Sequence, residues 1–373
     1  MLIYYVIIIV WFIIELIYLS KKKKYSVNIN ESMQKKLIKF LFIILIFVCA
    51  FRAYDRQHYI GIDTRGYYES YIQKTNYSLQ ANQLIENISG DPGYYLLECF
   101  LGYMSLPFNF LLIIEAFVYI GAIYLFIKHY SKDPIFSTLF FICLLFSFSM
   151  STIRQSLAMG ICLLAYMLYY KYKERKMKAI ITYGLLVMLA ISFHKSAIVF
   201  VPAILISKIK YNKKLIFVFL SIAALTMIFK NQFANFVISW AGGYSDKYAA
   251  SYSVTGDNVG TKFYIFILFF ILLNIIFSKK LNKNSESDSL IYMMLTMLII
   301  FPAVQSGGAM MRIYYYYYMF APVYIANTLN CLADKNLRLI VKLFIIVFLI
   351  YLFLNGNFVA NRLAPYYFSF SIL

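Results

Sequence analysis

The sequence predicts an all-α polytopic membrane protein, and three observations carry this prediction. Of its 373 residues, 62% are hydrophobic and only 14% are charged, whereas a soluble domain has about 25% charged residues. The mean hydropathy of the whole chain is +0.71, so its apolar surface exceeds what one buried core can hide. Apolar runs of about 20 residues, the length that crosses a bilayer, recur along it. This composition excludes a soluble globular enzyme, a disordered chain and a nucleic-acid-binding domain.

About 12 transmembrane helices are expected, in a single transmembrane domain that covers residues 1–373. They lie near 2–19, 37–54, 108–127, 134–149, 152–170, 178–193, 194–207, 215–230, 262–278, 290–304, 312–330 and 339–355. The apolar segment 94–106 is too short to cross, and we expect it to form a half-helix on the outer face. The longest stretches outside the spans, 55–93 and 231–261, are expected as outer-face loops, where sites usually lie.

The distribution of lysines sets the expected orientation. Lys21 to Lys24 follow the first span, and the positive-inside rule places such a cluster in the cytoplasm. Alternating the spans from there places both termini outside.

The arginines are distributed differently from the lysines. Topology needs only positive charge, yet most arginines fall on the side where positive charge is disfavoured. A planar guanidinium that stays charged when partly desolvated suits bidentate binding of phosphate or carboxylate. The more specific of two hypotheses is therefore that these arginines bind a polyphosphate-type ligand at the outer surface. The expected outer arginines are Arg52, Arg56, Arg65, Arg154, Arg312 and Arg362.

The alternative is that these arginines reach the interface or close salt bridges with acidic neighbours. Arg154 and Arg312 argue against it, because each begins a span and has no acid nearby in the sequence. The candidate acidic neighbours of the others are Asp55, Asp63, Glu69 and Asp91.

Two motifs in the first outer loop place carboxylates near this surface. Gly61 and Gly66 bracket a turn that can present Asp63 to a ligand, although Asp63 could instead cap the following helix. Asp91 followed by Pro92 is a helix-start signal, and the positive end of that helix would favour an anion.

Two further motifs lie at outer helix ends. Arg154 and Gln155 supply several donors at the start of a span, which is an anion-binding arrangement. His194, at the outer end of the sixth span, could act as a general base or donate to an anion, with a structural histidine as the alternative. The neighbouring Lys195 fits anion binding.

Other features carry less weight. Met311-Arg312 leads the run Tyr314 to Tyr318, which we expect to serve packing and an interfacial belt. Buried glutamates would be costly unless paired, and unpaired ones would suit a proton-coupled transporter; the candidates are Glu15, Glu98 and Glu115. No metal-ligand cluster, P-loop or dinucleotide fingerprint is visible, so we expect no cofactor and metal-independent chemistry.

Taken in order, these motifs resemble the EpsG-like branch of the Wzy-type bacterial polysaccharide polymerases. The resemblance runs across roughly residues 50–330, and it departs from the family at Asp91, where a glutamate is more usual. The motifs are Gly61-Ile62-Asp63-Thr64 with Tyr67, Asp91-Pro92-Gly93-Tyr94, Arg154-Gln155 with Ala158, His194-Lys195-Ser196-Ala197, and Arg312 with Tyr318.

The resemblance implies an enzyme of the bacterial cytoplasmic membrane, similar to the GT-C-like membrane glycosyltransferases. It would join undecaprenyl-pyrophosphate-linked oligosaccharide repeat units into a surface polysaccharide (O-antigen, capsule or exopolysaccharide) at the outer face. Its partners would be the lipid-linked donor and acceptor, membrane lipid, and a chain-length regulator or flippase, but no nucleic acid.

We expect Arg154 and Arg312 to bind the pyrophosphate, with His194 as the general base and Asp63 as the second candidate. Supporting substrate contacts are expected from Arg52, Arg65, Asp91, Gln155 and Lys195. Two alternatives stay open: a flippase or transporter for a lipid-linked glycan, and an O-antigen-ligase-like transferase.

Overall fold

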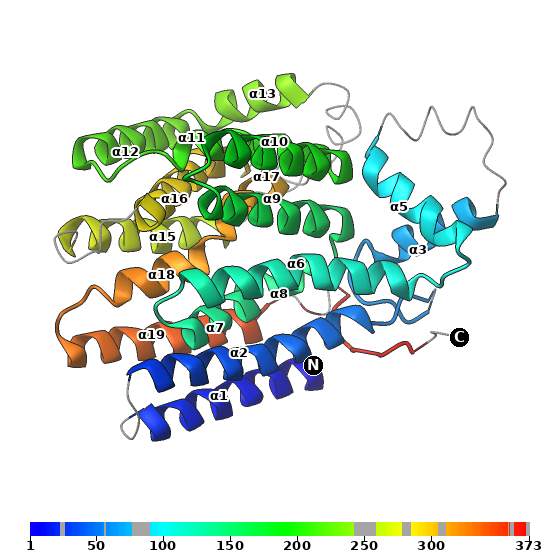
Figure 1. Cartoon of the computed structure of the whole chain (residues 1–373), viewed down its shortest axis with the longest axis horizontal. Helices are drawn as coiled ribbons and strands as arrows, with labels where there is room; N and C mark the ends of the chain where they lie inside the picture. The colour runs from blue at the N-terminus through cyan, green and yellow to red at the C-terminus, as the bar shows by residue number, and fades with distance from the viewer. Residues whose placement is uncertain are drawn as a thin grey trace. The chain divides into compact units, whose positions relative to one another are not determined.

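The computed structural model of the chain (Figure 1) describes residues 1–22, 27–55, 57–76, 90–241, 259–277, 285–304, 311–356, 358 and 362–370. Every regular element in this part of the chain is a helix, as the composition predicts. The chain forms two compact units, one of residues 1–195 with 339–373 and the other of residues 196–338. The expected single transmembrane domain stays a prediction.

The first unit contains ten helices of the described chain. α2 packs against α6, α6 against α9, and α9 against α10, while α5 packs against both α3 and α10. Its helices are α1 (Leu2–Lys22), α2 (Val27–Ala50), α3 (Thr64–Asn76), α5 (Pro92–Tyr103), α6 (Asn109–Tyr130), α7 (Pro134–Leu144), α8 (Phe146–Ser149), α9 (Ile153–Lys171), α10 (Lys176–Phe193) and α19 (Lys335–Leu354), which joins this unit at Leu339.

The second unit is organised around α16, which packs against α12, α17 and α18. Its tyrosine run serves packing, as expected: Tyr316 and Tyr317 are almost fully buried, and the Tyr317 hydroxyl donates to the Val199 carbonyl at 2.8 Å. Its elements are η1 (Lys195–Phe200), α11 (Ala203–Ile206), α12 (Lys213–Ile228), α13 (Lys230–Ala241), α15 (Val259–Phe277), α16 (Ser285–Val304), α17 (Met311–Tyr318) and α18 (Ala321–Leu329).

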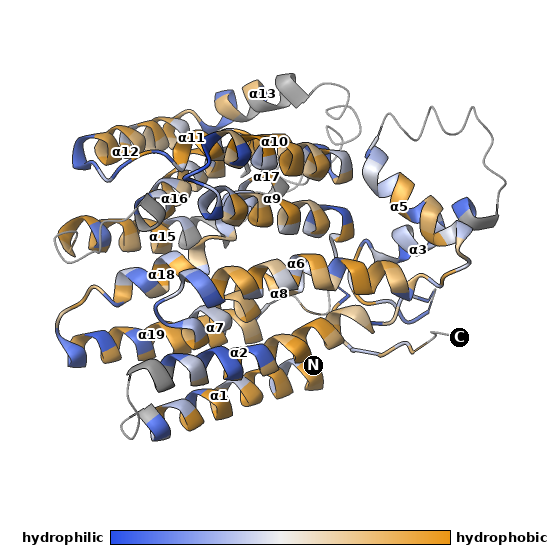
Figure 2. Cartoon of the chain, in the orientation of Figure 1, coloured by the Kyte–Doolittle hydropathy of each residue, from blue (hydrophilic) through white to orange (hydrophobic). Residues whose placement is uncertain are grey.

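Apolar residues run along most of the length of the helices (Figure 2). Among the described residues, α1, α6, α10 and α19 are each long and apolar enough to cross a membrane. Three expected spans are each divided between two shorter helices: 134–149 between α7 and α8, 194–207 between η1 and α11, and 312–330 between α17 and α18. The count of twelve spans and the orientation of the termini stay predictions.

Helix α5 occupies the segment expected as a half-helix. It begins at Pro92, directly after Asp91, as the Asp-Pro pair predicts, and has 12 residues. At 1.5 Å per residue it is about 18 Å long, short of the roughly 30 Å hydrocarbon core. The Asp91 side chain makes no capping hydrogen bond. Its carboxylate is therefore left for partners on other helices.

The three glutamates that were expected to need partners each form an ion pair. An isolated buried charge is costly, and a nearby cation offsets part of that cost. Because each acid already holds a cation, these glutamates lend less support to a proton-coupled transporter. The pairs are Glu115 with Arg52 at 3.1 Å, Glu98 with Lys74, and Glu15 with Lys342 at 2.8 Å, whose ammonium also lies 2.8 Å from Asp133.

Candidate functional site

Asp91 is the centre of a cluster that joins α5, α9 and the end of α10. Arg154 Nη1 donates to Asp91 Oδ2 at 2.8 Å, and the backbone N–H of Lys195 donates to Oδ1 at 3.1 Å. His194 Nδ1 lies 3.4 Å from the same Oδ2. One carboxylate thus holds an arginine, a histidine and a backbone donor, all within the first unit.

Helix packing explains why these residues meet. α9 and α10 are consecutive, closely packed helices joined by a short turn, so the start of α9, with Arg154, lies near the end of α10, with His194. Gly93 allows α5 to approach α10 closely, since a Cβ at this position would lie 2.2 Å from the Ser192 hydroxyl oxygen. This contact brings Asp91 to the end of α10.

Arg154 lies against two tyrosine rings that also contact each other, with ring centres 5.8 Å apart. Its guanidinium carbon is 5.4 Å from the ring centre of Tyr67 and 5.8 Å from that of Tyr94, distances at which a cation is attracted to an aromatic face. Nε also lies 3.5 Å from the Tyr67 hydroxyl. The rings belong to α3 and α5, in an apolar cluster that includes Phe108 and Leu157. Aromatic packing therefore fixes the plane of the guanidinium.

One edge of this guanidinium remains open. The Arg154 side chain is 33% exposed, whereas that of Asp91 is 2% exposed. Within the part of the chain that the structure describes, Arg154 Nη2 has no hydrogen-bond acceptor. The arginine is thus anchored to a buried carboxylate while its own side chain stays partly accessible.

The partners of Asp91 keep its carboxylate ionised. Burial alone would raise the pKa of Asp91, but the contact with His194, the charge of Arg154 and the Lys195 N–H together lower that pKa below its ordinary value. Asp91 is therefore an anion throughout the neutral range, and it also balances the charge of Arg154.

The carboxylate also has a consequence for His194. If the proton of the neutral imidazole is on Nδ1, it is directed to Asp91, and Nε2 is then the unprotonated nitrogen. This arrangement, in which a carboxylate orients a histidine, is the one that general-base histidines use.

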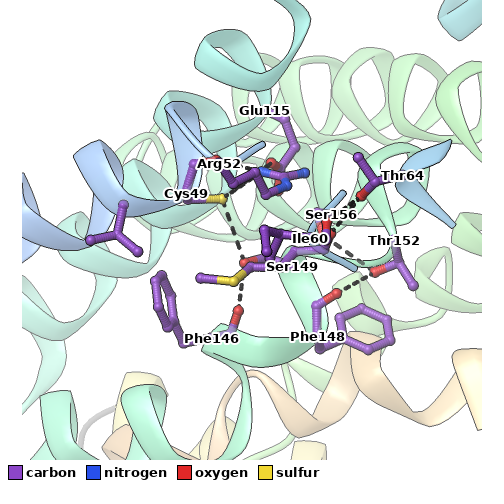
Figure 3. A network of polar contacts seen from close by, with 12 residues as sticks. Cys49, Arg52, Ile60, Thr64, Glu115, Phe146, Phe148, Ser149, Thr152 and Ser156 are labelled. Carbon is purple, nitrogen blue, oxygen red and sulfur yellow. Dashed lines mark hydrogen bonds and ion pairs between the residues drawn. The ribbon is translucent and has the colours of Figure 1, made fainter. Parts of the chain in front are cut away.

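A second polar network lies beside the start of α9 (Figure 3). Arg52 Nη1 donates to the Cys49 carbonyl at 2.6 Å and to Glu115 Oε2 at 3.1 Å. The Ser149 hydroxyl donates to the Phe146 carbonyl at 2.7 Å. This network ties the end of α2 to α6 and fixes the segment that precedes α9.

The other predicted site residues of the first unit differ in their burial and partners. Gln155 is buried next to Arg154, and Asp63 is half-buried just before α3. Arg65, on α3, is half-exposed and pairs with Glu69 at 2.8 Å. Arg52 is fully buried, so it lies behind the cluster; its predicted role in substrate binding stays a prediction.

Two predicted arginines are not placed at this cluster. Arg312 belongs to α17, in the second unit, and its side chain lies outside the described residues. Arg56 lies outside them entirely. Their roles stay predictions.

Sequence reasoning did not find the partner of Arg154. Asp91 is 63 residues away, so the absence of an acid near Arg154 in the sequence was misleading. It also missed the two flanking rings, although Tyr67 and Tyr94 stand inside the motifs Gly61 to Tyr67 and Asp91 to Tyr94. Each directly follows a glycine in the first turn of its helix, and this shared position is the signal that could have found them.

Among the described residues, no group of three or more His, Cys, Asp or Glu side chains is arranged to hold a metal ion. The expected metal independence stays a prediction.

Comparison with known proteins gives one match. The sequence model described as the EpsG family matches residues 39–368, a range that includes Asp91, Arg154 and His194. Neither the curated proteins nor the solved structures give a match.

Proposed function

The chain belongs to the EpsG family, a family of Wzy-like polysaccharide polymerases, and from the Asp91 cluster we propose how it works. It joins undecaprenyl-pyrophosphate-linked repeat units at the outer face of the bacterial cytoplasmic membrane. A hydroxyl of one unit attacks the anomeric carbon of the glycan on the other. The bond from that carbon to the phosphate oxygen breaks, and undecaprenyl pyrophosphate leaves with the electron pair.

Arg154 binds the departing pyrophosphate. The leaving group gains negative charge as the bond breaks, and donors already fixed in place stabilise that charge most effectively. Asp91 takes Nη1 of the guanidinium, and Nη2 of this partly exposed side chain donates to a phosphate oxygen. Lys195 and Gln155, which follow His194 and Arg154 directly in the sequence, are the supporting groups, and the contributions of Arg312 and Arg65 stay predictions from the sequence.

His194 takes the proton of the attacking hydroxyl on Nε2. Asp91 contacts Nδ1, and its negative charge stabilises the imidazolium that forms. Asp63, half-buried before α3, is the second candidate for this role. Asp91 is then a positioning residue for both the base and the pyrophosphate arginine, and not a ligand of the sugar.

A single observation carries this proposal: one buried carboxylate holds both a partly exposed arginine and a histidine. A flippase would need the arginine but has no use for an oriented base. An O-antigen-ligase-like transferase could use both, and it differs only in its acceptor.

Reconstitution tests the proposal. Purified protein in lipid vesicles receives synthetic undecaprenyl-pyrophosphate repeat units, without added metal, and the products are separated on a gel. We expect a ladder of lengthened glycan with the wild type and with Arg175→Ala, a matched control in the turn before α10, and no ladder with Arg154→Ala.

The other outcomes overturn the proposal. Movement of the lipid-linked unit across the vesicle membrane without a ladder identifies a flippase. Transfer of a single unit to a different acceptor identifies a ligase-like enzyme. A ladder of wild-type length from Arg154→Ala removes Arg154 from the mechanism.

A further inference from the structure

The C-terminal segment 362–370 runs beside the loop that follows α2. Arg52 and Phe368 form an antiparallel β-bridge. The Ala53 N–H donates to the Tyr367 carbonyl at 3.0 Å, and the Ser369 N–H donates to the Phe51 carbonyl at 2.9 Å. These backbone hydrogen bonds join parts of the chain that lie more than 300 residues apart in sequence.

Arg362 begins this segment in an unusual backbone conformation. Its φ is +54°, in the left-handed region that residues with a Cβ rarely adopt. Its carbonyl accepts a hydrogen bond from the Gly61 N–H at 2.9 Å. Its guanidinium carbon lies 5.6 Å from the ring centre of Tyr59. A strained residue of this kind persists because its surroundings hold it.

Gly61 connects this segment to the residues that precede α9. Its φ is +94°, and a Cβ at Gly61 would lie 2.0 Å from the Met150 carbonyl oxygen. The Thr64 hydroxyl donates to the Ile60 carbonyl at 2.6 Å and contacts the same Met150 oxygen at 3.1 Å. The loop is thus packed between Arg362 on one side and Met150 on the other.

Two short paths lead from this loop to the Asp91 cluster. Met150 lies four positions before Arg154, at the turn from which α9 starts. Through α3, the same loop leads to Tyr67, whose ring lies against the Arg154 guanidinium and whose N–H donates to the Asp63 carbonyl at 3.1 Å. A shift of Gly61 would therefore be felt both at the start of α9 and at a ring that flanks Arg154.

From this connectivity we propose that residues 362–370 are a positioning segment for the Arg154 site, and that the left-handed backbone of Arg362 is its key feature. The guanidinium of Arg362 is secondary. The structural part of the inference is independent of the chemistry, while its effect on catalysis rests on the proposed function.

Three substitutions at one position test the backbone role, because all of them remove the guanidinium. Glycine adopts a φ of +54° without strain, alanine does so less readily, and the β-branched valine least. In Arg362→Val, amide exchange of the peptide 57–70, measured by mass spectrometry on protein in lipid nanodiscs, should rise about tenfold. It should change less than about twofold in Arg362→Gly, and also in Arg362→Ala, because alanine carries the same unbranched Cβ as arginine.

Peptides from α6 serve as the folding control and should exchange equally in all variants. If Arg362→Val does not fold, the glycine and alanine variants still decide the question. A rise of about tenfold in the exchange of 57–70 in Arg362→Gly or Arg362→Ala overturns the inference, because the guanidinium and not the backbone would then hold the loop, as does unchanged exchange in a folded Arg362→Val.

Polymerisation then tests the link to Arg154. If the segment acts through Arg154, whose donors stabilise the charge that develops as the bond breaks, Arg362→Val should lower kcat more than it raises the KM for the lipid-linked unit. In that background, the further substitution Arg154→Lys should cost much less than it costs in the wild type. The link is refuted if the polymerisation rate of the double variant falls by the full product of the fold-losses measured for the two single variants. An inactive wild type refutes the proposed function, while the exchange data still decide the positioning role.

Discussion

Two arginine–carboxylate pairs lie in the same helical unit and differ in what surrounds them. The Arg52–Glu115 pair is sealed, with both side chains at 0% exposure and a separation of 3.1 Å. The Arg154–Asp91 pair is open on one side, with 33% of the Arg154 side chain exposed and a separation of 2.8 Å. The same chemistry thus provides structural support in one place and an available binding group in the other.

The contacts of each guanidinium show this difference in detail. Arg52 uses Nη1 to hold Cys49 and Glu115, while its Nε and Nη2 are buried and find no acceptor among the described residues. Arg154 packs against two tyrosine rings, and its side chain stays partly exposed. An arginine that binds a ligand needs a fixed guanidinium with an accessible edge, and only Arg154 shows both features.

The largest effect is expected from breaking the sealed pair. Arg52→Met leaves Glu115 buried without its cation, and losing one partner of a buried pair costs about 3–5 kcal/mol of unfolding free energy. We expect a strongly reduced protein level in the membrane and a lower Tm of the solubilised protein.

The double variant Arg52→Met/Glu115→Leu should recover most of this loss, because it removes both charges. A single variant with normal Tm but no polymerisation would contradict a structural role and would support the substrate contact that the sequence suggested.

A smaller effect on the fold and a large one on catalysis are expected at the open pair. Arg154→Lys keeps the charge but loses the planar set of donors, so polymerisation should fall about 100-fold while the membrane level stays normal. Rates of glycan ladder formation at matched protein amounts provide the measurement. Wild-type rates in this variant would rule out the proposal that one guanidinium binds both Asp91 and the pyrophosphate.

The smallest effect concerns acid stability. The pKa of Asp91 is lowered in the folded protein, so its contribution to stability is fully present above the ordinary carboxyl pKa of about 4. It is lost as pH falls through the lowered value. Tm measured from about pH 7 down to pH 3 should therefore show a gap between wild type and Asp91→Asn that is constant above about pH 5 and closes in acid. A gap that closes near neutrality would show that the pKa is not lowered.

The sequence was sufficient for features that depend on local patterns. Apolar runs predicted helices such as α1, α6, α10 and α19, and the Asp91-Pro92 pair predicted the start of α5. Arg154, Asp91 and His194 were chosen from their positions at helix ends, and the structure brings these three together.

What the sequence could not provide was pairing between distant segments. The ion pairs Arg154–Asp91 and Arg52–Glu115 each span 63 residues, and no periodicity records them. The breaks inside the expected spans 134–149 and 312–330 were also missed, because hydropathy alone does not register a change of helix direction. The closeness of Gly61 to Met150 depends on tertiary packing in the same way.

The ion pair between Glu15 and Lys342 has a consequence for biosynthesis. The carboxylate belongs to α1 and the ammonium to α19, 327 residues later. At about 5–20 residues per second, a ribosome needs on the order of tens of seconds to reach Lys342 after Glu15 has been made. During that interval the first apolar helix carries an acid whose cation does not yet exist. α19 therefore completes the charge balance of α1, and this ion pair can form only after Lys342 has been made.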